Sequence, residues 1–237
     1  MRYIVLTILT FIIIPNCLAQ REGVTQLRSS FSLNDKLTDL KGEPLLAKNE
    51  VSTDGSAFFS NEWSRGSLTL VSGKKYSSLL LKVNLQTDDV HYLLEETKAE
   101  RVAGKGIVKQ VDFKLSDQQD SIRFRSHFPS VEKNDLLTFY QVLVDGEVIL
   151  LKRIKRIFIE EKAFNSATIT HRFDTDNSYF VCLNKKMIKL KRNRTNILEL
   201  LTDKRSILEN YLSKNNISFK SDQDLKKLFE YYNSLKH

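Results

Sequence analysis

Residues 138–159, TFYQVLVDGEVILLKRIKRIFI, constrain the fold more than any other stretch of this 237-residue chain. Two runs rich in β-branched and aromatic residues flank Asp145-Gly146, a pair that readily adopts the positive φ angles of a tight hairpin turn. Both runs are apolar next to the turn, and a strand that is apolar on both faces is normally covered on both faces. The stretch therefore predicts a β-hairpin in the middle of a sheet.

Further strands are predicted on both sides of this hairpin, where apolar and polar residues alternate. The predicted strands before it cover residues 63–71, 76–85, 90–95, 107–115 and 121–128. Those after it cover residues 168–173, 179–183 and 187–190. Asp174-Thr175-Asp176-Asn177 is predicted as the hairpin turn between the first two of these, because Asp and Asn tolerate unusual backbone angles. Many short strands joined by tight turns are typical of a mainly antiparallel meander.

The pattern becomes helical near residue 195. The candidate N-terminal caps are Asn196, which forms a capping-box pattern with Glu199, Thr202 before residues 203–214, and Ser221 before residues 222–235. Leu225, Leu228, Phe229 and Tyr232 form the predicted buried stripe of the last helix. Helices this short bury little surface alone, so we expect them to dock on the sheet or on a partner.

The predicted fold class is therefore α+β. It combines a mainly antiparallel β meander, sandwich-like or built as a strongly curved sheet, with a C-terminal segment of two to three helices. The predicted boundaries are 1–19 for a signal peptide, 20–50 for a loosely structured arm, 51–194 for the β domain and 195–237 for the helical segment.

The first residues have the layout of a secretory signal peptide. Arg2 precedes an almost wholly apolar run over residues 3–14, and Cys17-Leu18-Ala19 places small residues at a cleavage position before Gln20. The alternative is a lipoprotein signal acylated at Cys17. Cleavage before Gln20 predicts an exported protein, in the periplasm, the cell envelope or the medium, with no transmembrane anchor. It also leaves Cys182 as the one cysteine, so we expect no intrachain disulfide and a buried thiol.

Three motifs in order are similar to a family of exported Bacteroidetes proteins with no established activity. They are GSAFFSNEW, the FYQVLVDGEVILLKR hairpin, and capped helices that end in LFEYYNSL. The resemblance covers roughly residues 55–235. It implies an envelope or secreted location and supplies no catalytic residues.

The positive charge is concentrated in one segment. Residues 152–194 carry 12 Lys and Arg against 4 Asp and Glu, which equals the formal net charge of +8 of the whole chain. The candidate binding surface consists of Lys152, Arg153, Lys155, Arg156, Lys185, Lys186, Lys189, Lys191, Arg192 and Arg194. Because Met187, Lys189 and Lys191 alternate with Ile188 and Leu190, we expect the lysines there to point to solvent together.

If the two basic runs are neighbours, they form a strip suited to an acidic envelope protein, an anionic polymer or lipid headgroups. The alternative is a solvated edge on which lysines prevent strand aggregation. No nucleic-acid-binding motif is present, and an exported protein is not expected to bind nucleic acid.

The sequence offers no catalytic constellation. The four histidines, His91, His127, His171 and His237, lack the spacing of a zinc site. Residues 174–178 resemble the start of a calcium loop, but Tyr179 stands where glycine is needed and Lys185 where a bidentate Glu is needed. We therefore expect no catalytic residue, cofactor or metal.

Three functions follow from these observations. The first is an exported, non-enzymatic envelope protein that binds or scaffolds, through the basic strip. The second is a carrier of an apolar ligand inside a curved sheet. The third is a hydrolase with a dispersed site, which would require His127 or His171 beside both a carboxylate and a hydroxyl.

Overall fold

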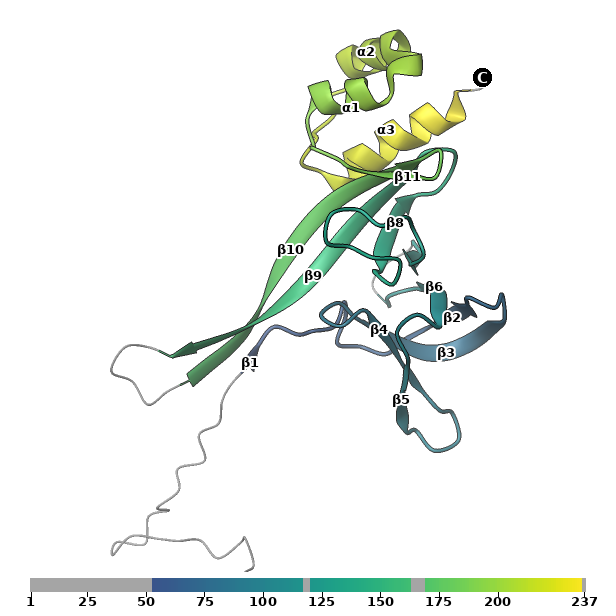
Figure 1. Ribbon diagram of the computed structural model, residues 1–237, viewed down its shortest axis with the longest axis vertical. Helices are drawn as coiled ribbons and strands as arrows, with labels where there is room; N and C mark the ends of the chain where they lie inside the picture. Colours follow the sequence, from purple (N-terminus) through teal and green to yellow (C-terminus); the bar gives the residue numbers. More distant parts are fainter. Residues whose placement is uncertain (1–52, 117–119, 163–168, 236–237) are drawn as a thin grey trace, which may run out of the picture. The chain divides into compact units, whose positions relative to one another are not determined.

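The computed structural model describes residues 53–116, 120–162 and 169–235 (Figure 1). All of them belong to one compact unit that spans residues 51–237. The predicted signal peptide at 1–19 and the predicted arm at 20–50 lie outside the described residues.

The described residues of this unit form a single 11-stranded sheet. Its strands are β1 (Thr53–Asp54), β2 (Ser64–Leu70), β3 (Lys75–Asn84), β4 (Asp89–Leu93), β5 (Glu100–Ala103), β6 (Val108–Phe113), β7 (Ile122–Arg125), β8 (Tyr140–Val144), β9 (Ile149–Lys162), β10 (Ile169–Leu183) and β11 (Lys186–Lys189). The order across the sheet is β1-β10-β9-β8-β7-β6-β2-β3-β4-β5, and β11 pairs with β10. Every pairing is antiparallel except that of β1 with β10. The mainly antiparallel α+β class is thus confirmed, whereas a two-sheet sandwich is not.

The hairpin formed by β8 and β9 lies inside the sheet, as predicted. Strand β9 pairs with β8 on one side and with β10 on the other. Leu150 belongs to an apolar cluster that includes the helices, and the next residue, Leu151, belongs to a second cluster around Phe128 and Phe180. Since successive residues of a strand point to opposite faces, both faces of the hairpin are covered.

The turn of this hairpin differs from the prediction. Neither Asp145 nor Gly146 is among the described residues with positive φ. Gly146 is needed for a different reason, since a Cβ atom there would lie 2.5 Å from Nδ2 of Asn233. The glycine therefore provides room for a side chain that lies far away in the sequence.

The predicted turn at residues 174–177 is wrong, because β10 is one continuous strand from Ile169 to Leu183. Asp174 pairs with Ile157 of β9, and Asp176 pairs with Lys155. The long neighbouring strand gives this polar segment a backbone partner, and the exposed position lets its side chains remain in water. Sheet pairing here outweighs local turn preference.

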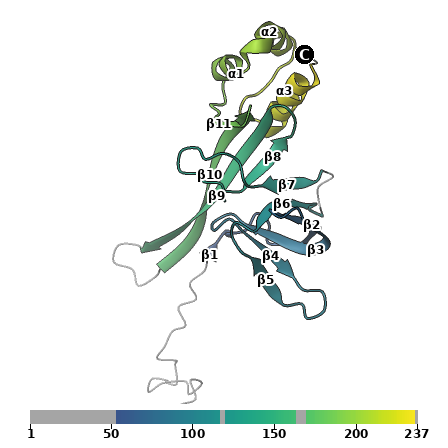
Figure 2. The same ribbon diagram turned by 45° about the vertical axis from the view of Figure 1, so that its right-hand side comes forward.

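Three α-helices follow the sheet: α1 (Arg194–Leu200), α2 (Arg205–Lys214) and α3 (Asp222–Ser234), with a 3-10 turn, η1 (Thr202–Lys204), before α2. Figures 1 and 2 show α3 against the ends of β8, β9 and β10, with α1 and α2 farther from the sheet. Leu225, Leu228, Phe229 and Tyr232 are buried, as predicted. The helices and the sheet share one apolar cluster.

Only one of the predicted caps is correct. The Ser221 hydroxyl accepts a hydrogen bond from the Asp224 N–H at the start of α3. Asn193, and not Asn196, caps α1, because its side chain accepts from the Asn196 N–H. Thr202 begins η1 instead of capping α2, which has no side-chain cap.

Candidate functional site

The structure places the ten predicted basic residues in several different environments. Arg153 is a core residue, with only 8% of its side chain exposed. Its Nη1 and Nη2 donate to Oδ1 and Oδ2 of Asp88 at 2.7 and 2.8 Å. Burial raises the pKa of Asp88, and the charge of Arg153 opposes that rise. This pair joins β9 to the turn after β3, so Arg153 is not available to a partner.

Lys152 of β9 and Arg192 lie beside Tyr179 of β10 and Asp222, the first residue of α3. Lys152 Nζ lies 2.6 Å from Asp222 Oδ2, and the Tyr179 hydroxyl donates to Asp222 Oδ1 at 2.5 Å. The Arg192 guanidinium lies 4.2 Å from the centre of the Tyr179 ring. Burial favours a raised pKa for Asp222, but the hydrogen bonds from Lys152 and Tyr179 outweigh it and hold the pKa below its ordinary value. These cations hold α3 on the sheet.

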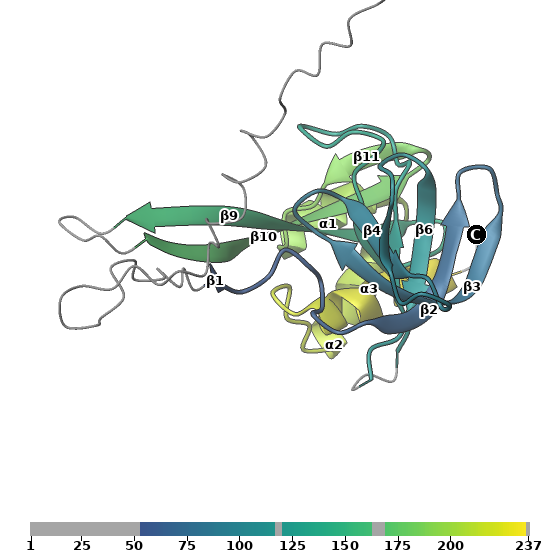
Figure 3. The same cartoon turned by 90° about the horizontal axis from the view of Figure 1, so that it is seen from below.

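Lys155 and Arg156 lie where β9 continues along β10 past its pairing with β8 (Figure 3). Arg156 Nη1 donates to the hydroxyl of Thr175, and Lys155 lies opposite Asp176. Lys155 is exposed, and Arg156 is half-buried. This pair of cations therefore has polar neighbours on β10.

Five cations between residues 185 and 194 are exposed, and we call them the β11 cluster: Lys185, Lys186, Lys189, Lys191 and Arg194. Lys189 Nζ lies 3.0 Å from Oε2 of Glu132. Among the described residues, no carboxylate forms a salt bridge with the other four. The cluster is therefore only partly neutralised.

The ten residues do not form one continuous strip. Lys186 lies opposite Leu183 and Lys155 opposite Asp176, seven residues apart along β10. At about 3.3 Å per residue this separation is about 23 Å. The two runs are also not neighbours, since β10 lies between β9 and β11.

Met187 and Ile188 of β11 face the opposite way from the prediction. Met187 packs against the cluster that contains Phe180, while Ile188 is 40% exposed. The pairing of Met187 with buried Cys182 explains why it points inward. The lysines at 186, 189 and 191 are nevertheless exposed, but Lys186 lies on the face of Ile188 and Lys189 on the face of Met187.

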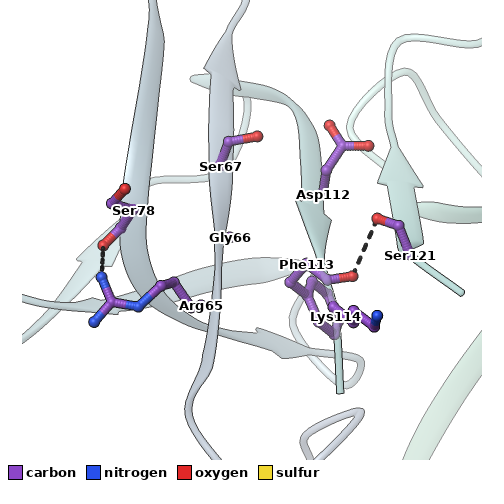
Figure 4. Close-up of a pocket in the computed structure, with 8 residues that line it drawn as sticks. All are labelled: Arg65, Gly66, Ser67, Ser78, Asp112, Phe113, Lys114 and Ser121. Atoms are coloured by element: carbon purple, nitrogen blue, oxygen red, sulfur yellow. Dashed lines mark hydrogen bonds between the residues drawn. The ribbon is translucent and has the colours of Figure 1, made fainter. Parts of the chain in front are cut away.

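A shallow hollow of about 400 Å³ lies between β2, β3 and β6 (Figure 4). Its lining residues are Arg65, Gly66, Ser67, Ser78, Asp112, Phe113, Lys114 and Ser121. Arg65 Nη1 donates to the Ser78 carbonyl, and the Ser121 hydroxyl donates to the Phe113 carbonyl. The lining holds no histidine or cysteine, and its one carboxylate, Asp112, accepts hydrogen bonds from Gln110 Nε2 and Arg123 Nε.

None of the described histidines has both partners that the hydrolase hypothesis requires. Nδ1 of His127 lies 2.7 Å from Oγ of Ser126, but that serine is only 2% exposed and donates to the Val108 carbonyl. His171 Nε2 lies 3.1 Å from a Glu160 oxygen, and among the described residues it is hydrogen-bonded to no hydroxyl. In the part of the chain that the structure describes, no histidine is hydrogen-bonded to both a carboxylate and a hydroxyl. His237 lies outside that part.

Cys182 is a free, buried thiol, and burial raises its pKa. Across residues 53–116, 120–162 and 169–235, no three His, Cys, Asp or Glu side chains come together as a possible metal site. No helix within these ranges is both long enough and apolar enough to cross a bilayer.

Comparisons with protein-family models, with curated proteins and with solved structures find no match to this chain. The resemblance to exported Bacteroidetes proteins therefore remains a prediction.

Proposed function

We propose that this chain is an exported, non-enzymatic protein of the cell envelope that binds an acidic partner through the β11 cluster. The observation that carries the proposal is the exposure of five cations in and beside strand β11, of which only Lys189 forms a salt bridge with a described carboxylate, Glu132. Uncompensated charge of one sign raises the local concentration of oppositely charged partners and their association rate.

The backbone beneath the β11 cluster is well anchored. Strand β11 pairs with β10 over four residues, and the side chain of Leu190 is buried beside it. The Asn193 cap then fixes the start of α1. Because the cations project from an ordered edge, a partner meets a defined charge arrangement and not a mobile tail.

The test is capture of envelope proteins by the full chain and by a Lys186→Glu/Lys191→Glu variant. A Lys98→Glu/Lys214→Glu variant is the matched control, since it makes the same charge change at exposed lysines elsewhere. We expect the first variant to lose captured acidic proteins, with capture by the unaltered chain weakening as salt is added. An identical captured set for all three chains would support the alternative, a solvated edge that only prevents aggregation.

The carrier alternative needs an apolar interior that is open to a ligand. Both faces of the β8–β9 hairpin pack against side chains of the chain itself. The strong curvature of the sheet that a carrier also requires remains a prediction.

A further inference from the structure

Exposed apolar side chains gather on three turns of the molecule. Ten large apolar side chains are exposed in the described part of the chain, and five of them lie in the β2–β3, β5–β6 and β7–β8 connections or within two residues of them. They are Val71 (47% exposed), Tyr76 (39%), Val102 (52%), Ile107 (54%) and Leu136 (50%). Half of the exposed apolar residues thus belong to three short segments, 71–76, 102–107 and 133–137.

Two contacts connect these three segments. The Val71 N–H donates to the Ile107 carbonyl at 2.9 Å, which joins the first segment to the second. Gly106 faces Leu137, because a Cβ atom built on Gly106 would lie 3.2 Å from Cδ2 of Leu137. The third segment therefore lies directly beside the second. We call the three segments together the three-turn patch.

The patch is basic as well as apolar. Its three segments contain four lysines, Lys74, Lys75, Lys105 and Lys133, against one acidic residue, Asp135. All four lysines are exposed. The Asp135 carboxylate accepts hydrogen bonds from the Leu137 N–H and the Thr138 hydroxyl, both at 3.0 Å, so it is engaged in the fold of its own loop.

We propose that the three-turn patch docks on the surface of an anionic lipid bilayer. Apolar side chains on turn tips can enter the interface between headgroups and acyl chains, while lysines beside them attract anionic phosphates. The centre of a protein–protein interface is instead depleted in lysine, and here lysines alternate with the apolar residues. The inference goes beyond the proposed function, because none of these residues belongs to the β11 cluster.

The test uses tryptophan fluorescence, since Trp63 is the one tryptophan in the chain. In a Trp63→Phe background, Ile107→Trp reports on the patch. Ile207→Trp on α2 is the matched control, because Ile207 is also an exposed isoleucine, at 44%. The chains are mixed with phosphatidylglycerol–phosphatidylcholine vesicles that carry bromine on the acyl chains, which quenches tryptophan at the interface. Residues 3–14 are themselves apolar, so a residue-specific signal is needed to locate the contact.

We expect the bromine to quench tryptophan at 107 and not at 207, and the quenching to be weaker on pure phosphatidylcholine. Equal quenching at both positions, or none at 107 on the anionic vesicles, would overturn the proposal. A change at 107 that grows with protein concentration in the absence of vesicles would also overturn it, because a second copy of the chain would then cover the patch.

Lysine substitutions in the otherwise unaltered chain provide a second measurement that does not depend on the Trp63→Phe background. Neutralising Lys74 and Lys105 to Gln should weaken partitioning into the anionic vesicles about fivefold for each lysine. Lys98→Gln/Lys214→Gln is the control pair. Equal partitioning of both double variants would count against the patch as the lipid contact.

Discussion

At the scale of single residues, Gly146 and Asn233 connect the central hairpin to the last helix. Asn233 accepts a hydrogen bond from the Val148 N–H at 3.1 Å and donates one to the Val148 carbonyl at 2.9 Å. Its side chain thereby hydrogen-bonds both the N–H and the carbonyl of Val148, as the backbone of a neighbouring strand would. The close approach requires the absence of a Cβ atom at position 146.

This contact predicts that Gly146→Ala and Asn233→Ala have non-additive effects. Gly146→Ala should lower the free energy of unfolding by about 1–3 kcal/mol, because it displaces Asn233 from its two hydrogen bonds. In an Asn233→Ala background the same change should cost about 0.5 kcal/mol or less, since the obstructing amide is gone. Urea unfolding of the four chains measures the coupling. Additive losses would show that the two residues act independently.

The buried Asp88–Arg153 pair leads to a second residue-scale prediction. Arg153→Met would leave the Asp88 carboxylate buried with its Phe139 N–H contact alone, so we expect a loss of about 3–5 kcal/mol. Adding Asp88→Asn should recover part of that loss, because the uncompensated charge is removed. Thermal unfolding of the single and double variants tests this, and a double variant less stable than Arg153→Met would contradict it.

At the scale of elements, the salt bridge between Asp222 and Lys152 connects the start of α3 to β9. Because Asp222 has a pKa below its ordinary value in the folded chain, its contribution to stability is complete above the unfolded pKa of about 3.9. That contribution is lost as pH falls through the lower, folded pKa. Acid should therefore loosen the contact between α3 and the sheet.

The corresponding prediction compares the unaltered chain with Asp222→Asn across pH. The stability difference between them should be constant from neutral pH down to about 5 and shrink as pH falls below about 4. Urea unfolding at each pH gives the difference, with Asp176→Asn as an exposed control. If the stability difference between the two chains did not shrink at the lowest pH, the negative charge of Asp222 would not be the source of its contribution.

At the scale of the whole molecule, strand β9 joins the three apolar clusters. It contributes Leu150 to the cluster that includes the helices, Leu151 to the cluster around Phe180, and Ile154 to the cluster around Phe124. The helical end and the β2–β6 end therefore share one strand. We expect them to unfold together.

Trp63, beside β2, and the helical circular dichroism signal should consequently report the same unfolding midpoint. Phe229→Ala removes a fully buried ring of α3 and should destabilise the chain by about 3–5 kcal/mol. The substitution should lower the unfolding midpoint by the same amount in both signals, although Trp63 lies in a different part of the sheet. A Trp63 transition that did not move would show that the two ends unfold separately.

Patterns that are local in the chain were predictable. The apolar faces of the β8–β9 hairpin, the Ser221 cap and the buried stripe of α3 each follow from residues a few positions apart, whose spacing fixes which face they share. The cap of α1 and the start of α2 were misassigned within a few residues, since several neighbouring polar side chains can compete for one set of free N–H groups.

By itself, the sequence determined a mainly antiparallel sheet with helices after it, because alternation and helical spacing decide which residues must be buried. Only the tertiary structure decided which cations form salt bridges. Arg153 pairs with Asp88 and Lys152 pairs with Asp222, and both partners are distant in the sequence. It also decided that residues 174–177 continue a strand, because β9 offers them a partner. The physical reason is the same in each case: pairing between distant residues depends on sheet order and on which turns meet, and neither is encoded in local spacing.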